Sequence, residues 1–135
     1  MLCIAPLEET MDDFYEMIWQ SKSKLIISLS ALIENKKMKM TQFWPEKEGI
    51  METNIFNISV KTEFNENDET CIRILIVKNL IHNESREIVQ LHFVGWPDNE
   101  APKDPASVIN IYHLQKKYQL EGINQNLDGP VIVHW

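Results

Sequence analysis

The sequence contains few cysteines and few arginines. Only Cys3 and Cys71 occur among its 135 residues, and neither has a histidine or a second cysteine at metal-ligand spacing. We therefore expect no disulfide framework and no metal site, and we interpret both cysteines as small buried apolar residues. The only arginines are Arg73 and Arg86, both in or beside strand-like segments.

Positive charge is also scarce. Lys and Arg number 13 against 20 Asp and Glu, which leaves a net charge of -7. A protein that binds phosphate backbones or anionic lipid needs a basic face, so we expect neither a nucleic-acid partner nor a membrane partner. The one basic cluster, at Lys36, Lys37 and Lys39, is interpreted as a solvated loop.

Long apolar runs are missing. The longest mostly apolar stretch, residues 25–33, contains Ser28 and Ser30 and is far too short to span a bilayer. Residues 1–7 have no basic flank and lead directly into Glu8 and Glu9, which is not the layout of a secretory signal. We therefore expect a cytoplasmic protein that needs no cofactor.

The composition is that of one globular unit. Hydrophobic residues make up 44% and charged residues 24% of the chain, and no repeat or low-complexity tract interrupts it. Residues 1–135 are therefore assigned to a single domain.

The first half shows one helical and several strand-like patterns. Thr10 and Asp13 form an N-cap signature before apolar residues at helical spacing, which predicts a helix over residues 11–20. Residues 25–29 read as a buried strand and residues 34–40 as a polar loop. Three strands rich in Ile and Val are expected at residues 54–61, 70–77 and 87–93, with a hairpin connection at residues 63–69.

The second half contains a proline-rich loop, a helix and a final strand. Gly95, Pro97 and Pro102 exclude regular structure from residues 95–104. Asp104 then caps a helix that begins at Pro105. Its apolar stripe is predicted to be Val108, Ile111, Tyr112, Gln115 and Tyr118. Residues 131–133 read as a fully buried strand, so the chain is expected to be α/β, a mixed twisted sheet with flanking helices.

One run of residues points to chemistry. His92-Phe93-Val94-Gly95-Trp96-Pro97-Asp98, followed by Ala101-Pro102, resembles the mobile acid loop of the protein-tyrosine phosphatase family. Other segments resemble parts of that family in the same order. These are the segment from Ala5-Pro6 through Trp19, then Glu34, Lys39 and Gln42-Phe43-Trp44-Pro45, and finally Gly129-Pro130-Val131-Ile132-Val133-His134. The resemblance covers essentially the whole chain.

The resemblance implies a mechanism and a set of roles. A cysteine thiolate attacks the phosphorus of a phosphotyrosyl protein, and a loop aspartate matching Asp98 protonates the leaving tyrosine oxygen. Trp96 would anchor the loop hinge and Pro97 would restrict its path. Lys39 would hold the closed loop, and Glu34 would position the arginine of the phosphate cradle.

The main departure from the family lies at the end of the sequence. The family places its nucleophilic cysteine immediately after the histidine matching His134, and here that residue is Trp135. We therefore expect an incomplete phosphatase-like domain without nucleophile, phosphate cradle or catalytic activity, and with Asp98 as a vestige of the acid. The later helices of the family would normally cover one face of the sheet. Their absence would expose apolar surface and strand edges, which favours self-association.

Two other interpretations remain open. The first is a pseudophosphatase that serves as a protein-interaction module, and the second is an unrelated α/β domain that matches by accident. Decayed phosphatase copies are familiar from insect-associated viruses such as the polydnaviruses, and the abundance of Lys, Ile and Asn is compatible with such an origin.

Overall fold

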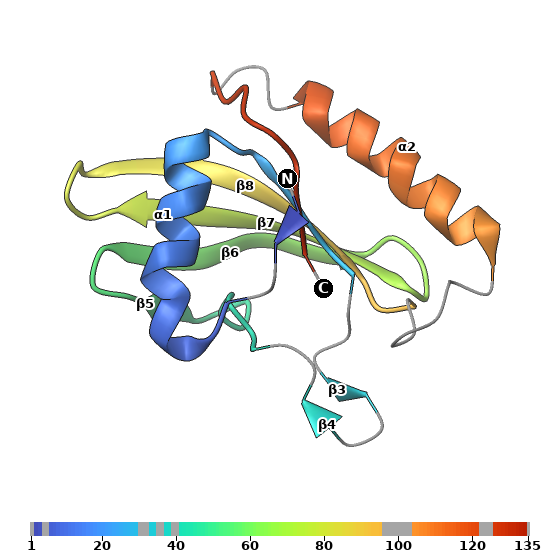
Figure 1. The fold of residues 1–135 in the computed structure, drawn as a ribbon, viewed down its shortest axis with the longest axis horizontal. Helices are drawn as coiled ribbons and strands as arrows, with labels where there is room; N and C mark the ends of the chain where they lie inside the picture. The colour runs from blue at the N-terminus through green and yellow to red at the C-terminus, as the bar shows by residue number, and fades with distance from the viewer. Residues whose placement is uncertain are drawn as a thin grey trace.

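One twisted sheet organises the part of the chain that the structure describes (Figure 1). The computed structural model describes residues 2–3, 6–29, 33–34, 37–38, 41–95, 104–121 and 126–134. Within these ranges, seven strands are hydrogen-bonded in the order β1-β9-β2-β8-β7-β6-β5. They are β1 (Leu2–Cys3), β2 (Leu25–Ser28), β5 (Ile50–Glu52), β6 (Phe56–Asn65), β7 (Thr70–Asn79), β8 (Glu84–Phe93) and β9 (Ile132–His134).

The sheet has an antiparallel half and a parallel half. Strands β5 to β8 pair antiparallel as a meander, whereas β8, β2, β9 and β1 pair parallel. The predicted strands and the mixed α/β fold with flanking helices are confirmed, except that the last strand is not fully buried, because Val131 and Val133 are half-buried. Sequence patterns missed β1 and β5 because strands of two and three residues are too short to show alternation. The loop predicted at residues 34–40 contains a small antiparallel ribbon, β3 (Ile33–Glu34) with β4 (Lys37–Met38).

Helix α1 (Met11–Ser21) packs on one face of the sheet. Its apolar face buries Phe14, Tyr15 and Ile18 against Phe56 and the neighbouring strands. The Tyr15 hydroxyl donates a hydrogen bond to the Phe43 carbonyl oxygen. Burial raises the pKa of Tyr15 far above its usual value, so the donor proton is retained.

The predicted N-cap of this helix is wrong in one respect. Thr10 occupies the N-cap position but makes no side-chain cap bond to the helix. Its Oγ1 instead accepts a hydrogen bond of 2.9 Å from the Leu7 amide, because a 3-10 turn, η1 (Glu8–Thr10), precedes the helix directly. The left-handed backbone of Lys22, with φ of 57°, ends the helix.

Helix α2 (Pro105–Glu121) packs against a second group of buried apolar residues, drawn from β2, β7 and β8. The Asp104 carboxylate accepts a 2.9 Å hydrogen bond from the Ala106 amide, as expected for a cap. The predicted apolar stripe is partly wrong. The buried residues are Ile111, Leu114 and Tyr118, whereas Val108 and Tyr112 are 39% and 54% exposed. Ile111, Leu114 and Tyr118 recur at spacings of three and four residues, which places them on the one face of the helix that meets the sheet. Tyr112 lies off that face.

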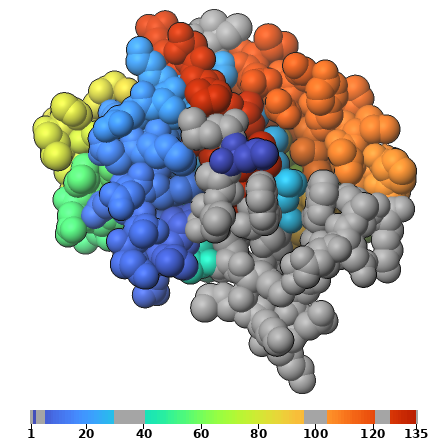
Figure 2. Space-filling model, in the orientation of Figure 1, coloured from blue at the N-terminus to red at the C-terminus, as the bar shows by residue number. Residues whose placement is uncertain are grey.

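Gly129 positions the last strand. A Cβ at this residue would lie 1.9 Å from the Ser21 carbonyl oxygen, so only glycine fits here. The Gly129 amide donates to the Lys22 carbonyl oxygen at 2.9 Å. Figure 2 shows the resulting contact between the red C-terminal segment and the blue surface of α1. This contact directs β9 into the sheet between β1 and β2. Neither described helix is long and apolar enough to cross a membrane.

Candidate functional site

Two strands that flank β2 lead into the predicted catalytic segments. Strand β8 ends at Phe93, the second residue of the acid-loop motif, and β9 ends at His134, next to position 135. Both strands pair parallel to β2, and Ser28 is in register with His92 and with His134. Since parallel strands end at the same edge of a sheet, β8 and β9 end at one edge, on either side of β2. The two segments that the sequence singled out thus start from one place.

The predicted site residues themselves are mostly outside the described ranges. Trp96, Pro97, Asp98 and Lys39 belong to these undescribed positions. Glu34 is described only as backbone, in β3. The catalytic and supporting roles assigned to these five residues therefore stay predictions.

A line of hydrogen-bonded side chains runs across the sheet beneath this edge. We call it the polar chain; its members are Glu63, Arg73, Gln90, Ser28 and His134. Arg73 Nη1 donates to Gln90 Oε1 at 3.2 Å, and Gln90 Nε2 donates to Ser28 Oγ at 3.0 Å. Ser28 Oγ and His134 Nε2 share a hydrogen bond of 2.7 Å. Because arginine only donates, the orientation of the Gln90 amide follows directly.

The outer end of the polar chain is anchored by charge. Arg73 Nε donates to the Glu63 carboxylate at 2.5 Å, and both side chains are partly buried. The Arg73 guanidinium also lies 4.6 Å from the centroid of the Trp44 ring, at cation–π distance. Arg73 Nη1 is 3.1 Å from His92 Nδ1, which must therefore accept and carry a lone pair. Trp44 and Trp19 are buried core aromatics.

The inner end of the polar chain is a fully buried histidine. His134 has no exposed surface and contacts the rings of Phe14 and Phe43, with centroids 6.1 and 5.1 Å away. Burial, with a smaller contribution from the nearby His92, lowers the pKa of His134 to about 4. The imidazole is therefore neutral at physiological pH.

A side chain, and no described backbone group, satisfies the His134 ring. Its Nε2 partner is the Ser28 hydroxyl, and its buried Nδ1 has no partner in the described part of the chain. Sequence analysis gave no role to Ser28 or Gln90. The available signal was a polar residue, Ser28 or Gln90, next to apolar residues in each strand, since a buried polar group needs a partner.

Cys71 is not fully buried as predicted. It lies half-buried in β7 beside Arg73 and Glu63. Burial raises the pKa of the Cys71 thiol, the Arg73 charge opposes this effect, and Glu63 adds to it. The side chain is therefore a neutral thiol at physiological pH and a weak nucleophile.

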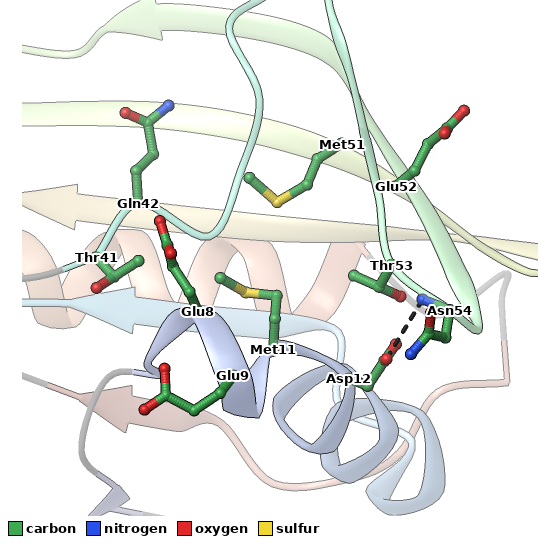
Figure 3. Close-up of a pocket in the computed structure, with 10 residues that line it drawn as sticks. All are labelled: Glu8, Glu9, Met11, Asp12, Thr41, Gln42, Met51, Glu52, Thr53 and Asn54. Carbon is green, nitrogen blue, oxygen red and sulfur yellow. Dashed lines mark hydrogen bonds between the residues drawn. The ribbon is translucent and has the colours of Figure 1, made fainter.

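A separate hollow lies between the start of α1 and strand β5 (Figure 3). We call it the acidic pocket; its volume is about 610 Å³. Met11 and Met51 extend into it from opposite sides. Its lining contains four carboxylates, those of Glu8, Glu9, Asp12 and Glu52. Among the described residues, no group of three or more potential ligands could hold a metal ion.

The fold defines a class of protein: an α/β domain in which β8 and β9 end at one edge of a mixed sheet, on either side of β2. Residues 1–135 match the family model described as protein-tyrosine phosphatase. The chain therefore belongs to the protein-tyrosine phosphatase family.

Individual relatives agree with this assignment. The chain is 36% identical over 129 residues to receptor-type tyrosine-protein phosphatase alpha of Mus musculus. It is 29% identical over 136 residues to tyrosine-protein phosphatase non-receptor type 2 of Homo sapiens. A solved complex of PTPN18 with HER2 phosphopeptides superposes with a TM-score of 0.85, at 26% identity over 97% of this chain.

The chain corresponds to only part of these proteins. It spans 15% of the receptor-type relative, 32% of the non-receptor relative and 46% of the solved PTPN18 chain. It is thus a portion of a protein-tyrosine phosphatase domain.

Proposed function

We propose that residues 1–135 form the acid-loop portion of a protein-tyrosine phosphatase domain and do not hydrolyse phosphotyrosine by themselves. In this proposal Asp98 is the family's general acid, worth a factor of about 10² to 10⁴ in rate where a nucleophile is present. Trp96 and Pro97 shape its loop, while Lys39 and Glu34 support it. The substrate class is the phosphotyrosyl protein, on which the family acts.

The observation that carries the proposal is the residue after His134. The family's thiolate nucleophile follows this histidine, and the residue here is Trp135, whose indole cannot attack phosphorus. Loss of a covalent nucleophile removes the reaction path, whereas loss of a supporting group only slows it.

Cys71 does not replace the missing nucleophile. Strands β2 and β8 separate it from β9 in the sheet. Its pKa is raised by burial, so little thiolate is present at neutral pH. Arg73, which is bonded to Glu63 and Gln90, is likewise not available as a phosphate clamp.

A phosphatase assay tests this proposal. The 135-residue chain is incubated with p-nitrophenyl phosphate and with a phosphotyrosyl peptide, and phosphate release is compared with buffer. We expect no release above buffer, either in a first-turnover burst or at steady state. A Cys71→Ser variant is the matched control. Release by the parent chain that the Cys71→Ser variant lacks would show that the chain carries its own nucleophile and would overturn the proposal.

The mass of the endogenous protein tests whether these residues occur alone or as part of a longer chain. A mass near 15.8 kDa by intact mass spectrometry is the value for these 135 residues alone. A substantially larger mass would place Asp98 in a longer chain and make an active phosphatase the leading interpretation.

A second candidate function is a pseudophosphatase that binds a protein partner. Exposed apolar side chains on α2 favour it, since Ile109 is 56%, Tyr112 54% and Leu120 67% exposed. Affinity capture from native cell extract tests it, with an Ile109→Gln, Leu120→Gln variant as control. Recovery of the same proteins by the parent and by this variant would argue against binding through α2.

A further inference from the structure

The neutral ring of His134 can carry its proton on either nitrogen. A neutral imidazole has one N–H group and one lone pair, and the hydrogen bond made by one nitrogen fixes the place of the proton. The ring is fully buried, and its hydrogen-bond partner in the described part of the chain is the Ser28 hydroxyl, at Nε2. The direction of this one hydrogen bond therefore decides the tautomer of His134.

The direction of the bonds along the polar chain is set at its charged end. Arg73 can only donate, so the group of Gln90 that faces it is the carbonyl oxygen Oε1, at 3.2 Å. The other end of the same amide, Gln90 Nε2, must then donate, and it reaches Ser28 Oγ at 3.0 Å. Arg73 is itself held by the Glu63 carboxylate. Each bond thus orients the next one, from β6 and β7 towards β2.

Ser28 passes this direction on to His134. Its oxygen already accepts from Gln90 Nε2, and His134 Nε2, at 2.7 Å, can accept the hydroxyl proton. If Nε2 carried the ring proton instead, Ser28 Oγ would accept twice. Its own proton would then have no recorded acceptor at a fully buried position, which is costly. An accepting Nε2 leaves the ring proton on Nδ1.

We propose that the polar chain selects the tautomer of His134 and holds the ring in the Nδ1–H form, with Gln90 and Ser28 as the positioning residues. Nδ1 is the buried nitrogen that has no partner in the described part of the chain. As an N–H donor at the end of β9, it can take a carbonyl, hydroxyl or anionic oxygen but not another N–H group. The inference does not depend on the proposed lack of phosphatase activity, because it concerns only described side chains.

His92 provides an internal comparison at the same edge. Arg73 Nη1 lies 3.1 Å from His92 Nδ1, so this nitrogen accepts and the ring proton lies on Nε2. His92 and His134 are both in register with Ser28, one on each side of β2. Two buried histidines on neighbouring strands are thus expected to be opposite tautomers.

Long-range proton–nitrogen NMR of the imidazole rings tests the proposal, because the two neutral tautomers give different correlation patterns. The nitrogen-15-labelled chain carries His82→Gln and His113→Gln, which removes the two exposed histidines. At neutral pH we expect one ring of each tautomer. The Nδ1–H form of His134 should exceed its Nε2–H form by about tenfold or more, which is about 1.4 kcal/mol. Two rings in the Nε2–H form would overturn the proposal.

A Gln90→Glu variant reverses the direction of the polar chain. Its carboxylate has nearly the shape of the amide, stays ionised beside Arg73 and can only accept. Ser28 then donates to this carboxylate and accepts from His134, so we expect the His134 ring to change to the Nε2–H form. Gln115→Glu, which adds the same charge on α2, is the matched control and should leave the tautomer unchanged. An Nδ1–H form that persists in Gln90→Glu would show that the polar chain does not direct the proton.

Variants of Ser28 distinguish proton selection from packing. Ser28→Ala removes the hydroxyl, and we expect the excess of the Nδ1–H form of His134 to fall about tenfold. Ser28→Thr keeps the hydroxyl and should retain that excess. His92, which is bonded to Arg73 and not to Ser28, should keep its Nε2–H form in both variants. An unchanged excess in Ser28→Ala would refute the role of Ser28.

Discussion

Replacing Ser28 with alanine tests the energetic weight of the polar chain. The Ser28 hydroxyl bonds His134 Nε2 at 2.7 Å and accepts from Gln90 Nε2 at 3.0 Å, and all three residues are buried. The Ser28→Ala variant leaves both partners without this group. A buried polar group that loses its partner costs about 1 to 3 kcal/mol. Two groups, His134 Nε2 and Gln90 Nε2, lose this partner, and the structure around them relaxes in part. We therefore expect the free energy of unfolding to fall by about 2 to 4 kcal/mol.

The assay is urea unfolding followed by tryptophan fluorescence, since Trp19 and Trp44 are buried. Ser85→Ala is the control because Ser85 is exposed on β8, and it should change the free energy by less than about 0.5 kcal/mol. A loss below about 0.5 kcal/mol for Ser28→Ala would refute the view that these bonds stabilise the end of β9.

Three further results are expected. His134 has a pKa of about 4 in the folded state against an ordinary value of 6.5, so folding favours the neutral ring. The contribution of His134 to stability is therefore full above pH 6.5 and is lost as the pH falls toward 4, by about 3 kcal/mol. Urea unfolding at several pH values checks this, and a His134→Gln variant that keeps the same pH dependence would contradict it. Gly129→Ala should cost about 3 kcal/mol or more, because its Cβ would meet the Ser21 carbonyl oxygen at 1.9 Å. The control is Gly49→Ala, where the nearest atom is 3.4 Å away, and equal thermal midpoints would refute the clash. The chain should self-associate through α2, and Ile109→Gln with Leu120→Gln should shift sedimentation toward monomer more than Ile81→Gln does; a parent chain that sediments as a monomer would contradict this.

The helices and most long strands could be predicted from the sequence because their signals are local. Asp104 and Pro105 mark the start of α2, and the apolar runs of β6, β7 and β8 show within about ten residues of chain. The family could be predicted for a similar reason, since its motifs are contiguous and in order. The single-domain assignment and the roles of Asp98, Trp96, Pro97, Lys39 and Glu34 stay predictions.

The sequence by itself determined which segments become helix or strand, the excess of negative charge, and the tryptophan at position 135. Local propensity and composition depend on near neighbours, so the order of residues suffices for them. Only the tertiary structure decided that β9 enters the sheet beside β2 and that Ser28 bonds a histidine 106 residues away. The acidic pocket likewise forms only where the start of α1 meets β5. Such contacts arise from topology and close packing, which bring together residues whose own sequence neighbourhoods contain no sign of the partner.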